Sequence, residues 1–559
     1  MKKVSLLVLE SKLCSIIFKN TLLKKVVFLL DKKLSSEALK AGYYGSTVKK
    51  LSVLLALSLI LLVPSFIILF LIILSGSYLL LPIPLILPML PQILFYAYLK
   101  NLVAKRSNGL RRELPYFTLY IATLQSAGIP LHISLYKIAR SNILKSVKEE
   151  AMVFLRDVRL LGKDPLSALD SLAKNCPYKQ FQDILYGYSS IYRSGGDLVR
   201  YLHEKVKDYF RELKFQWKMF VERSMDLGEA LTTFFTVSML IILLSSLILS
   251  KGFIPMIILL NSVILPMAFI LSLMLIESII PENIFHINIV KKYLVISFVI
   301  ASIFFLSVNY MLNDFLFAIV TASSAFMLSY GIAFKLNGKA LKDIENGLPA
   351  LLRDLTEFRK LGFTPAQAIV RLVSSRKYNK GLNEYLNKVA MNIRAGLGFR
   401  EIPKTGSWLF DYTVFILKEI EESGGGTPAI LENLTQHVSD VMQFRREARS
   451  ALRLYELLAY TSPLMLIFSL FLTLKLINLL SLSEVTLLLT GLGITLEKSI
   501  ITMLKTTIVE ASLILSLLTS KIIDFSLKNT LRASIVLLIS LLGFIIIPEI
   551  VNMLVKAIT

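Results

Sequence analysis

The sequence predicts an all-α integral membrane protein with about nine transmembrane helices and two repeated helical-bundle domains on the cytoplasmic side. Hydrophobic residues make up 55% of the 559-residue chain. They gather in charge-poor blocks of about twenty residues, the length of helix that spans a bilayer. Two long charged stretches between these blocks carry the same short motifs in the same order, which indicates an internal repeat. The formal net charge of +23 is typical of a membrane protein with basic cytoplasmic loops.

Transmembrane helices are predicted wherever an apolar block is long enough to cross the hydrocarbon layer. The predicted spans are Leu51–Ile73, Ser77–Leu99, Leu231–Leu249, Ile254–Ile276, Tyr293–Met311, Phe315–Phe334, Leu457–Ile477, Ile501–Leu518 and Ala533–Leu554. The chain then divides into a basic amphipathic N-terminal cytoplasmic segment (1–50), a transmembrane pair (51–100), a first cytoplasmic helical domain (101–228), four transmembrane helices (229–334), a second cytoplasmic helical domain (335–456) and three transmembrane helices (457–559). Residues 475–505 are mostly apolar, so the span boundaries there stay open.

The distribution of lysine and arginine predicts the orientation of the chain. Residues 1–50 hold eleven lysines against three acidic residues, residues 101–228 hold 21 basic against 13 acidic, and residues 335–456 hold 19 against 14. Nine spans place all three stretches on one side, which the positive-inside rule assigns to the cytoplasm. We therefore expect a multi-pass protein of the cell (cytoplasmic) membrane whose N-terminus is cytoplasmic and whose C-terminus lies outside.

The two cytoplasmic stretches contain corresponding prolines and glycines, which we expect to be structural corners. A Leu-Pro pair is expected to open a helix, because proline in the first turn loses no hydrogen bond. Thirteen residues later a glycine is expected to end that helix in a left-handed conformation. The corner residues are Pro115, Gly128, Gly162, Gly195 and Gly196 in the first copy, and Pro349, Gly362, Gly396, Gly424 and Gly425 in the second.

A long charged helix with an apolar seam is predicted after each Gly-rich corner. Apolar residues recur at alternating steps of four and three, the spacing of a coiled-coil seam. The seam residues are Val206, Phe210, Leu213, Trp217 and Phe220 in the first copy, and Val441, Phe444, Ala448, Ala451 and Tyr455 in the second. Each seam can pack on its own bundle, form a dimer contact, or pack one repeat against the other.

The sequence offers no convincing active site. It lacks a phosphate-binding loop, a zinc-protease motif and a nucleophile elbow. Its four histidines, His132, His203, His286 and His437, are scattered, and its two cysteines, Cys14 and Cys176, have no metal-binding spacing. We expect no enzyme activity, no cofactor and no bound metal. Nucleic-acid binding is not expected either, because no recognition motif accompanies the positive charge.

The ordered motifs resemble the type II secretion system F domain. The resemblance rests on Leu-Pro at Pro115, Ala-Gly-Ile-Pro at Gly128, Leu-Gly at Gly162 and Ser-Gly-Gly-Asp ending at Asp197. The second copy departs from this pattern at Gly426, which stands in place of the acidic residue. Two copies and about nine spans look most similar to the archaeal platform proteins of type IV pili and the archaellum. The resemblance implies a non-catalytic platform that anchors a hexameric cytoplasmic secretion ATPase and couples it to insertion of pilin or archaellin subunits.

Two groups of side chains are candidates for function. Basic residues near the glycine corners are candidate ATPase contacts, and they are Arg193, Arg200, Lys205, Arg394 and Arg400. Glu510 lies inside a predicted span, where ionisable groups are functional candidates. Glu510 and the proline-broken spans also leave open a polytopic transporter, although a transporter repeat would consist of spans rather than large soluble domains. The type of filament stays open, while lipid contact and a homodimer fit the resemblance.

Overall fold

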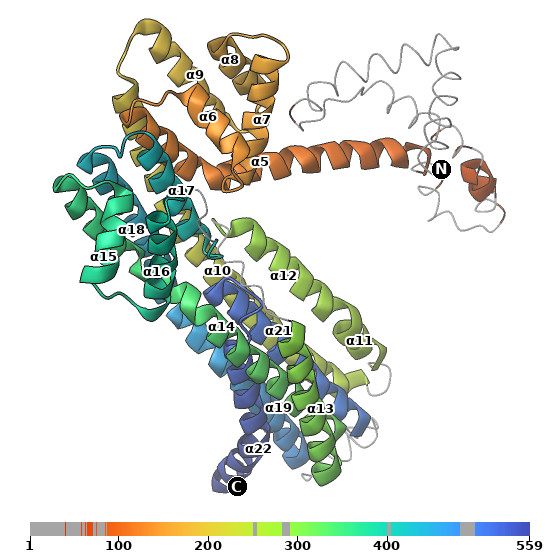
Figure 1. The fold of residues 1–559 in the computed structure, drawn as a ribbon. Coiled ribbons are helices and arrows are strands. Elements are labelled where there is room, and N and C mark those ends of the chain that lie inside the picture. The colour runs from red at the N-terminus through yellow and green to blue at the C-terminus, as the bar shows by residue number, and fades with distance from the viewer. Residues whose placement is uncertain are drawn as a thin grey trace, which may run out of the picture. The chain divides into compact units, whose positions relative to one another are not determined.

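The computed structural model describes residues 87–249, 254–281, 291–399, 404–480 and 498–558, with short stretches and single positions between residues 40 and 84. All secondary-structure elements of this described part are helices (Figure 1). The chain divides into two compact units, Met1–Lys207 and Asp208–Thr559. The helix α10, Leu198–Leu249, begins in the first unit and continues into the second.

The first unit is built on one long helix and four shorter ones. After the short helix η2 (Leu87–Met89), these helices are α5 (Leu90–Ser126), α6 (Leu131–Arg140), α7 (Lys145–Arg159), α8 (Pro165–Asn175) and α9 (Lys179–Ser194). Each buries one apolar face at helical spacing. Phe117 of α5 stacks on Phe181 of α9 with ring centroids 5.2 Å apart, while Tyr120, Leu135 and Ile184 are fully buried around them.

The glycine corners share one hydrogen-bonded geometry. Gly128 follows α5 with φ +82°, and the next residue, Ile129, donates its backbone N–H to the carbonyl of Leu124 at 2.8 Å. Gly195 follows α9 with φ +68°, and Gly196 donates to the carbonyl of Ile191 at 3.0 Å. This is the Schellman motif, in which a left-handed residue allows the chain to leave the helix with its last carbonyls bonded.

The two Leu-Pro pairs do not open helices. Pro115 lies inside α5 and Pro349 lies inside α14 (Phe315–Lys360), so this expectation from the sequence is wrong. An interior proline costs a helix about 3 kcal/mol. Leu114 and Phe117 beside Pro115, and Leu348 beside Pro349, are at most 1% exposed. Each such burial contributes about 1.5–3 kcal/mol, so the packing of these helices offsets the cost of the proline.

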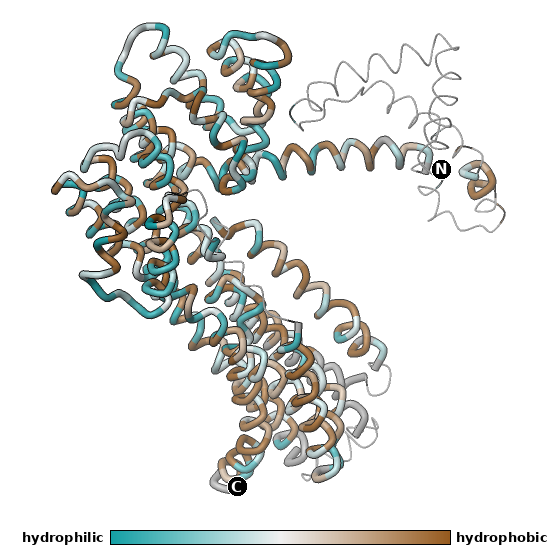
Figure 2. The backbone as a smooth tube through the Cα atoms, in the orientation of Figure 1, coloured by the Kyte–Doolittle hydropathy of each residue, from teal (hydrophilic) through white to brown (hydrophobic). Residues whose placement is uncertain are grey.

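The second unit contains the apolar helices, most of them long. They are α11 (Ile254–Leu259), the π-helical turn η4 (Leu260–Ile264), α12 (Leu265–Ile279), α13 (Lys291–Leu312), α14, α19 (Arg453–Leu480), α21 (Lys498–Asp524) and α22 (Leu531–Ile558). Six helices in the described part are long and apolar enough to cross a membrane, and their hydrophobic colouring is clear in Figure 2. The described part is therefore all-α, and its long apolar helices are those of a multi-pass membrane protein.

These six helices coincide with the last six of the nine predicted spans. They include Ile501–Asp524, which coincides with the eighth predicted span despite the charged residues inside it. The predicted span Leu231–Leu249 coincides with the end of α10, where most side chains lie outside the described part. Most of Leu51–Ile73 and of Ser77–Leu99 also lies outside the described residues.

The C-terminal end of α14 packs with four further helices of the second unit. These are α15 (Pro365–Ser375), α16 (Lys380–Arg394), α17 (Trp408–Glu422) and α18 (Pro428–Ala451). Gly362 and Gly424 end α14 and α17 with positive φ and the same Schellman bonds as the first-unit corners. The described residues between α16 and α17 form no helix, whereas the first unit has α8 between α7 and α9. This explains why the second stretch is shorter between its corners.

The two predicted seams meet within the second unit. Phe210 of α10 lies 4.4 Å, ring to ring, from His437 of α18, and the Lys214 ammonium lies 5.7 Å from the ring centre of Phe444. Further along α10, Gly228 lies so close to the ring of Tyr455 that an added Cβ would lie 1.9 Å from it. Within the second unit α10 therefore lies against α18 and α19, and α18 also packs on α14 of its own bundle, where Arg445 pairs with Glu345.

Candidate functional site

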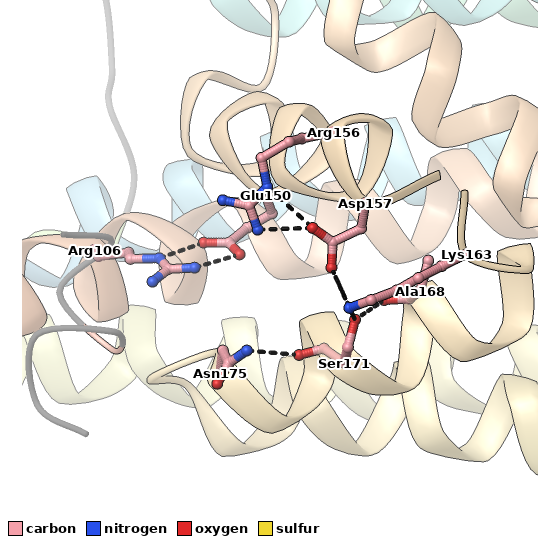
Figure 3. Close-up of polar contacts among 8 residues, drawn as sticks. All are labelled: Arg106, Glu150, Arg156, Asp157, Lys163, Ala168, Ser171 and Asn175. Atoms are coloured by element: carbon pink, nitrogen blue, oxygen red, sulfur yellow. Dashed lines mark hydrogen bonds and ion pairs between the residues drawn. The ribbon is translucent and has the colours of Figure 1, made fainter. Parts of the chain in front are cut away.

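A buried ion pair joins two helices of the first unit. Arg106 of α5 donates from Nε to Glu150 Oε1 of α7 at 2.5 Å and from Nη2 to Oε2 at 2.6 Å (Figure 3). Glu150 is fully buried, and the Arg106 side chain is 10% exposed. A planar guanidinium matches both carboxylate oxygens, so this pair fixes the rotation of α5 as well as its distance from α7.

A second polar cluster lies at the end of α7. Asp157 accepts hydrogen bonds from Arg156 at 2.7 Å, from Lys163 at 2.9 Å and from Ser171 of α8 at 3.1 Å (Figure 3). Burial is the largest influence on the pKa of Asp157 and acts to raise it, but the bonds from Lys163, Arg156 and Ser171 together lower this pKa below its ordinary value. The carboxylate thus stays charged and ties the turn at Gly162 to α8.

The N-terminus of α7 is capped from another helix. Glu113 of α5 accepts hydrogen bonds from the backbone N–H groups of Ser146 and Val147, both at 2.9 Å. Carboxylates are favoured at helix N-termini, where N–H groups lack partners inside the helix. Burial raises the pKa of Glu113 above its ordinary value, and these backbone bonds oppose the rise. The contact therefore stabilises the same helix pair as Arg106 and Glu150.

The candidate basic residues of the first unit lie around the corner at Gly195. Arg193 donates to Asp170 at 2.6 Å and stays 53% exposed. Arg200 is 78% exposed and pairs with Glu204 at 3.2 Å. The Lys205 ammonium lies 5.8 Å from the centre of the Tyr201 ring. Of these three residues Arg193 lines a surface hollow of about 790 Å³, together with Asp170, Ser171, Lys174, Tyr186 and Ser190.

In the second unit the corresponding corner is held by a different side chain. Arg359 of α14 donates from Nε to the carbonyl of Gly426 at 2.9 Å. A Cβ on Gly425 would lie 3.2 Å from this guanidinium, so the arginine fills the space that a larger corner residue would take. The candidate Arg394 is exposed at the end of α16, and Arg400 lies outside the described residues.

The second unit contains a network of charged side chains that was not predicted from the sequence. Arg445 of α18 pairs with Glu345 of α14 at 2.5 Å, with both side chains at most 8% exposed. Arg532 at the start of α22 pairs with Asp524 at 3.0 Å and also with Glu456 of α19. The only signal in the sequence was the presence of charges on otherwise apolar helix faces, and that signal does not identify partners.

An aromatic residue in the turn between α21 and α22 extends this network. Phe525 has φ +57°, and its ring lies 5.4 Å from Trp217 and 5.6 Å from Phe220 of α10. On its other side, the Arg449 guanidinium of α18 lies 5.4 Å from the ring centre. One turn residue therefore joins α10, α18 and the pair of membrane helices α21 and α22.

Groups that could perform chemistry are few in the described part. No three His, Cys, Asp or Glu side chains there are grouped to hold a metal ion. Cys176 is fully buried, and burial raises the pKa of its thiol to about 12, so this cysteine is a packing residue. His203 lies 3.1 Å from the Ser126 hydroxyl, whereas His286 lies outside the described residues.

An acidic side chain lies within one of the membrane-spanning helices. Glu510 lies in α21, and its Oε2 atom is buried without a hydrogen-bond partner. One turn away, Thr507 donates to the side-chain carbonyl of Asn261 at 2.9 Å, and the Asn261 amide donates to Thr506 at 3.2 Å. Asn261 lies in the π-helical turn η4.

Comparison with known proteins identifies the first helical stretch. Residues 117–249 match the family model described as "Type II secretion system (T2SS), protein F". The matched segment begins inside α5 and ends with the last residue of α10. No curated protein and no solved structure matches the chain. The match confirms the resemblance for the first of the two stretches that carry the motifs.

Proposed function

The chain carries a domain of the type II secretion system protein F family, and from this premise we propose that it is the cytoplasmic-membrane platform for assembly of a type IV pilus-like filament. The filament would be an archaeal pilus or an archaellum. In this role the protein anchors the secretion ATPase and couples its motion to insertion of pilin subunits, without catalysing a reaction itself. The family match at residues 117–249 is the observation that carries the proposal.

The arrangement of the chain supports this function. The matched helices end in α10, which is 52 residues long and thus about 78 Å at 1.5 Å per residue. Such a helix is long enough to cross a membrane about 30 Å thick and to extend well beyond it. Movement of its cytoplasmic portion would therefore act on its membrane portion without an intervening loop.

We further propose that α14–α18 form a second F-type domain, with nine spans, a cytoplasmic N-terminus and an external C-terminus. The Schellman corners at Gly362 and Gly424 stand in the same motif order as those at Gly128 and Gly195. The lack of a helix among the described residues between α16 and α17, together with the contact of Arg359 with Gly426, makes the second domain a modified copy. The two domains would then bind the ATPase unequally.

The proposed partners follow from charge and hydropathy. The basic cytoplasmic surface suits docking of an ATPase with acidic patches, because complementary charge steers association and sets orientation. Arg193, Arg200, Lys205, Arg394 and Arg400 are the proposed contacts. The membrane-spanning helices would meet pilin helices and anionic lipid. A homodimer is compatible with a hexameric ATPase ring, which offers two-fold symmetry.

Binding of the purified protein to the secretion ATPase of the same organism tests this proposal. Arg200→Glu should weaken binding several-fold and reduce its salt dependence, because exposed charges act mainly on the association rate. Arg211→Glu is a matched control, since Arg211 is also 78% exposed and paired within α10 but lies three turns further along the helix. Equal effects of both variants would refute a specific contact at the corner.

A complete absence of ATPase binding, with both proteins folded, would remove the coupling mechanism. The transporter interpretation would then be tested by uptake of a labelled solute into proteoliposomes. Uptake that depends on Glu510 would support that alternative, because intramembrane carboxylates mark transport pathways.

A further inference from the structure

A turn with two exposed leucines follows α7 in the first unit. Leu160 and Leu161 come directly after the helix and are 79% and 60% exposed. Their backbone N–H groups both donate to the carbonyl of Arg156, at 2.8 and 3.3 Å, and Gly162 then turns the chain with φ +63°. A hydrogen-bonded turn thus holds two large apolar side chains in the open, where clustered apolar groups mark a binding surface.

Two arginines and a tyrosine lie beside this turn. The guanidinium carbons of Arg140 and Arg159 lie 4.2 and 4.8 Å from the ring centre of Tyr136. Neither arginine has an ion pair within the described part of the chain. The two arginines, the tyrosine and the two leucines therefore form an apolar surface with two guanidinium groups open to a ligand. This surface is named the α6–α7 tip below, and it consists of Tyr136, Arg140, Arg159, Leu160 and Leu161.

The carboxylates that lie near the tip in the sequence are already occupied. Asp157 accepts hydrogen bonds from Arg156 and Lys163. Asp164 caps α8, where its carboxylate accepts from two backbone N–H groups at 3.0 and 3.3 Å. The tip thus has an excess of positive charge, and planar guanidinium groups are suited to the paired oxygens of a phosphate.

The course of α7 directs the tip toward the membrane end of the first unit. At the start of α7, Ser146 donates its backbone N–H to Glu113 of α5. One turn later, Glu150 pairs with Arg106, which lies nearer the beginning of α5. As α7 proceeds, it therefore runs toward the end of α5 that continues the predicted span Ser77–Leu99.

The distances along these helices are short enough for contact with lipid headgroups. Arg106 is seven residues beyond Leu99, which is about 10 Å of helix. Leu160 is ten residues beyond Glu150, about 15 Å further along α7. The polar headgroup region extends about 5–8 Å beyond the hydrocarbon on each side. The tip therefore lies on the side of the first unit that faces the predicted membrane surface.

We propose that the α6–α7 tip docks on anionic phospholipid at the surface of the membrane that holds the protein. Leu160 and Leu161 enter the boundary between headgroups and acyl chains, Tyr136 lies at that boundary, and the guanidinium groups pair with phosphates. A bilayer is favoured over a protein partner because α5 keeps the unit beside it, at high effective concentration. The tip is separate from the proposed ATPase contacts, so the inference does not depend on ATPase binding.

Fluorescence quenching on the full chain in lipid nanodiscs tests the proposal. A dye is attached at Leu161→Cys in a Cys14→Ser background, while Cys176 is fully buried and stays unlabelled. Quenching by nitroxide-labelled lipid is compared between nanodiscs of zwitterionic lipid and nanodiscs that contain anionic phospholipid. We expect strong quenching only with anionic lipid. A dye at Ser194→Cys, an exposed position at the end of α9, should show little quenching in either.

Variants of exposed residues then assign the effect to the tip. Arg140→Gln/Arg159→Gln should lower the ratio of docked to undocked protein about thirtyfold, because each basic residue near an anionic surface contributes about fivefold. Leu160→Gln should also lower this ratio, through loss of apolar contact. Arg211→Gln/Lys218→Gln removes the same charge from exposed side chains of α10 and should leave the quenching unchanged.

Three results would overturn the proposal. Quenching that is equal in both lipids and unchanged in Arg140→Gln/Arg159→Gln would exclude recognition of anionic lipid by the arginines. Quenching by iodide in solution, without quenching by labelled lipid, would place the tip in water. Protection from both quenchers would show that protein covers the tip, either another part of this chain or a partner.

Discussion

Removal of the buried carboxylate of Glu150 should destabilise the packing of α5 against α7 in the first unit. Glu150 is fully buried, and its partner Arg106 is 10% exposed, so Glu150→Ala leaves a guanidinium without its counter-charge in a largely dry site. Breaking one side of a buried ion pair costs about 3–5 kcal/mol. Replacing both partners by apolar residues of similar volume is often near neutral, so the double variant Arg106→Met/Glu150→Met should recover most of the loss.

Hydrogen exchange measured by mass spectrometry on the full chain in nanodiscs would report this change. A loss of 3–5 kcal/mol corresponds to exchange roughly a hundred- to several-thousand-fold faster in peptides from α5 and α7, because each tenfold change is about 1.4 kcal/mol. Glu149→Ala is the matched control, since the neighbouring Glu149 is exposed and should change stability by less than about 0.5 kcal/mol. Equal exchange in Glu150→Ala and Glu149→Ala, or a double variant as unstable as both single variants combined, would refute a stabilising role of the buried ion pair.

One close helix contact, one backbone conformation and one titration give further tests. Gly331→Ala should destabilise the packing of α14 on α22 by about 1–3 kcal/mol, because the new Cβ would lie 2.6 Å from the backbone nitrogen of Leu531; thermal unfolding followed by tryptophan fluorescence would measure it. Gly362→Ala should cost about 1–2 kcal/mol for a different reason, since φ is +90° with no atom near the Cβ, and Gly362→Asn should recover part of this loss in the same assay. Burial and the nearby Lys207 lower the pKa of His203, so the unfolded chain takes up a proton before the folded one. Stability should therefore fall as the pH drops below about 6.5, and His203→Gln should flatten this dependence in exchange rates corrected for intrinsic pH effects.

Local chemistry made the helix ends predictable. A glycine directly after an apolar helical face has few uses other than a left-handed C-terminal residue, and Gly128, Gly195, Gly362 and Gly424 all have positive φ. Pro115 was predicted to open a helix but lies inside α5. The preference of proline for a first turn reflects local chemistry alone. In α5 the burial of flanking side chains outweighs that rule, and the extent of burial depends on helices that are distant in sequence.

The polar contacts could not be derived from the sequence. Arg106 and Glu150 are 44 residues apart, and Glu345 and Arg445 are 100 apart, so pairing depends on how the helices pack. The exposed basic residues were easier to place near a corner, because Arg193 and Arg200 are close to Gly195 in the sequence. The partners of these arginines differ in how easily they can be predicted. Glu204 is one turn from Arg200 on the same helix, while Asp170, the partner of Arg193, comes from α8.

The uninterrupted length of α14 has a mechanical consequence. Its 46 residues form a rod of about 69 Å, of which a membrane about 30 Å thick encloses less than half. Because α14 continues as one helix without a loop, a tilt of the part beyond the bilayer is passed to the part inside it, apart from any bend at Pro349. A tilt of about 10° would displace one end relative to the other by about 12 Å over that length. A small torque on the part of α14 beyond the bilayer would therefore shift the helices that pack on its membrane-spanning part.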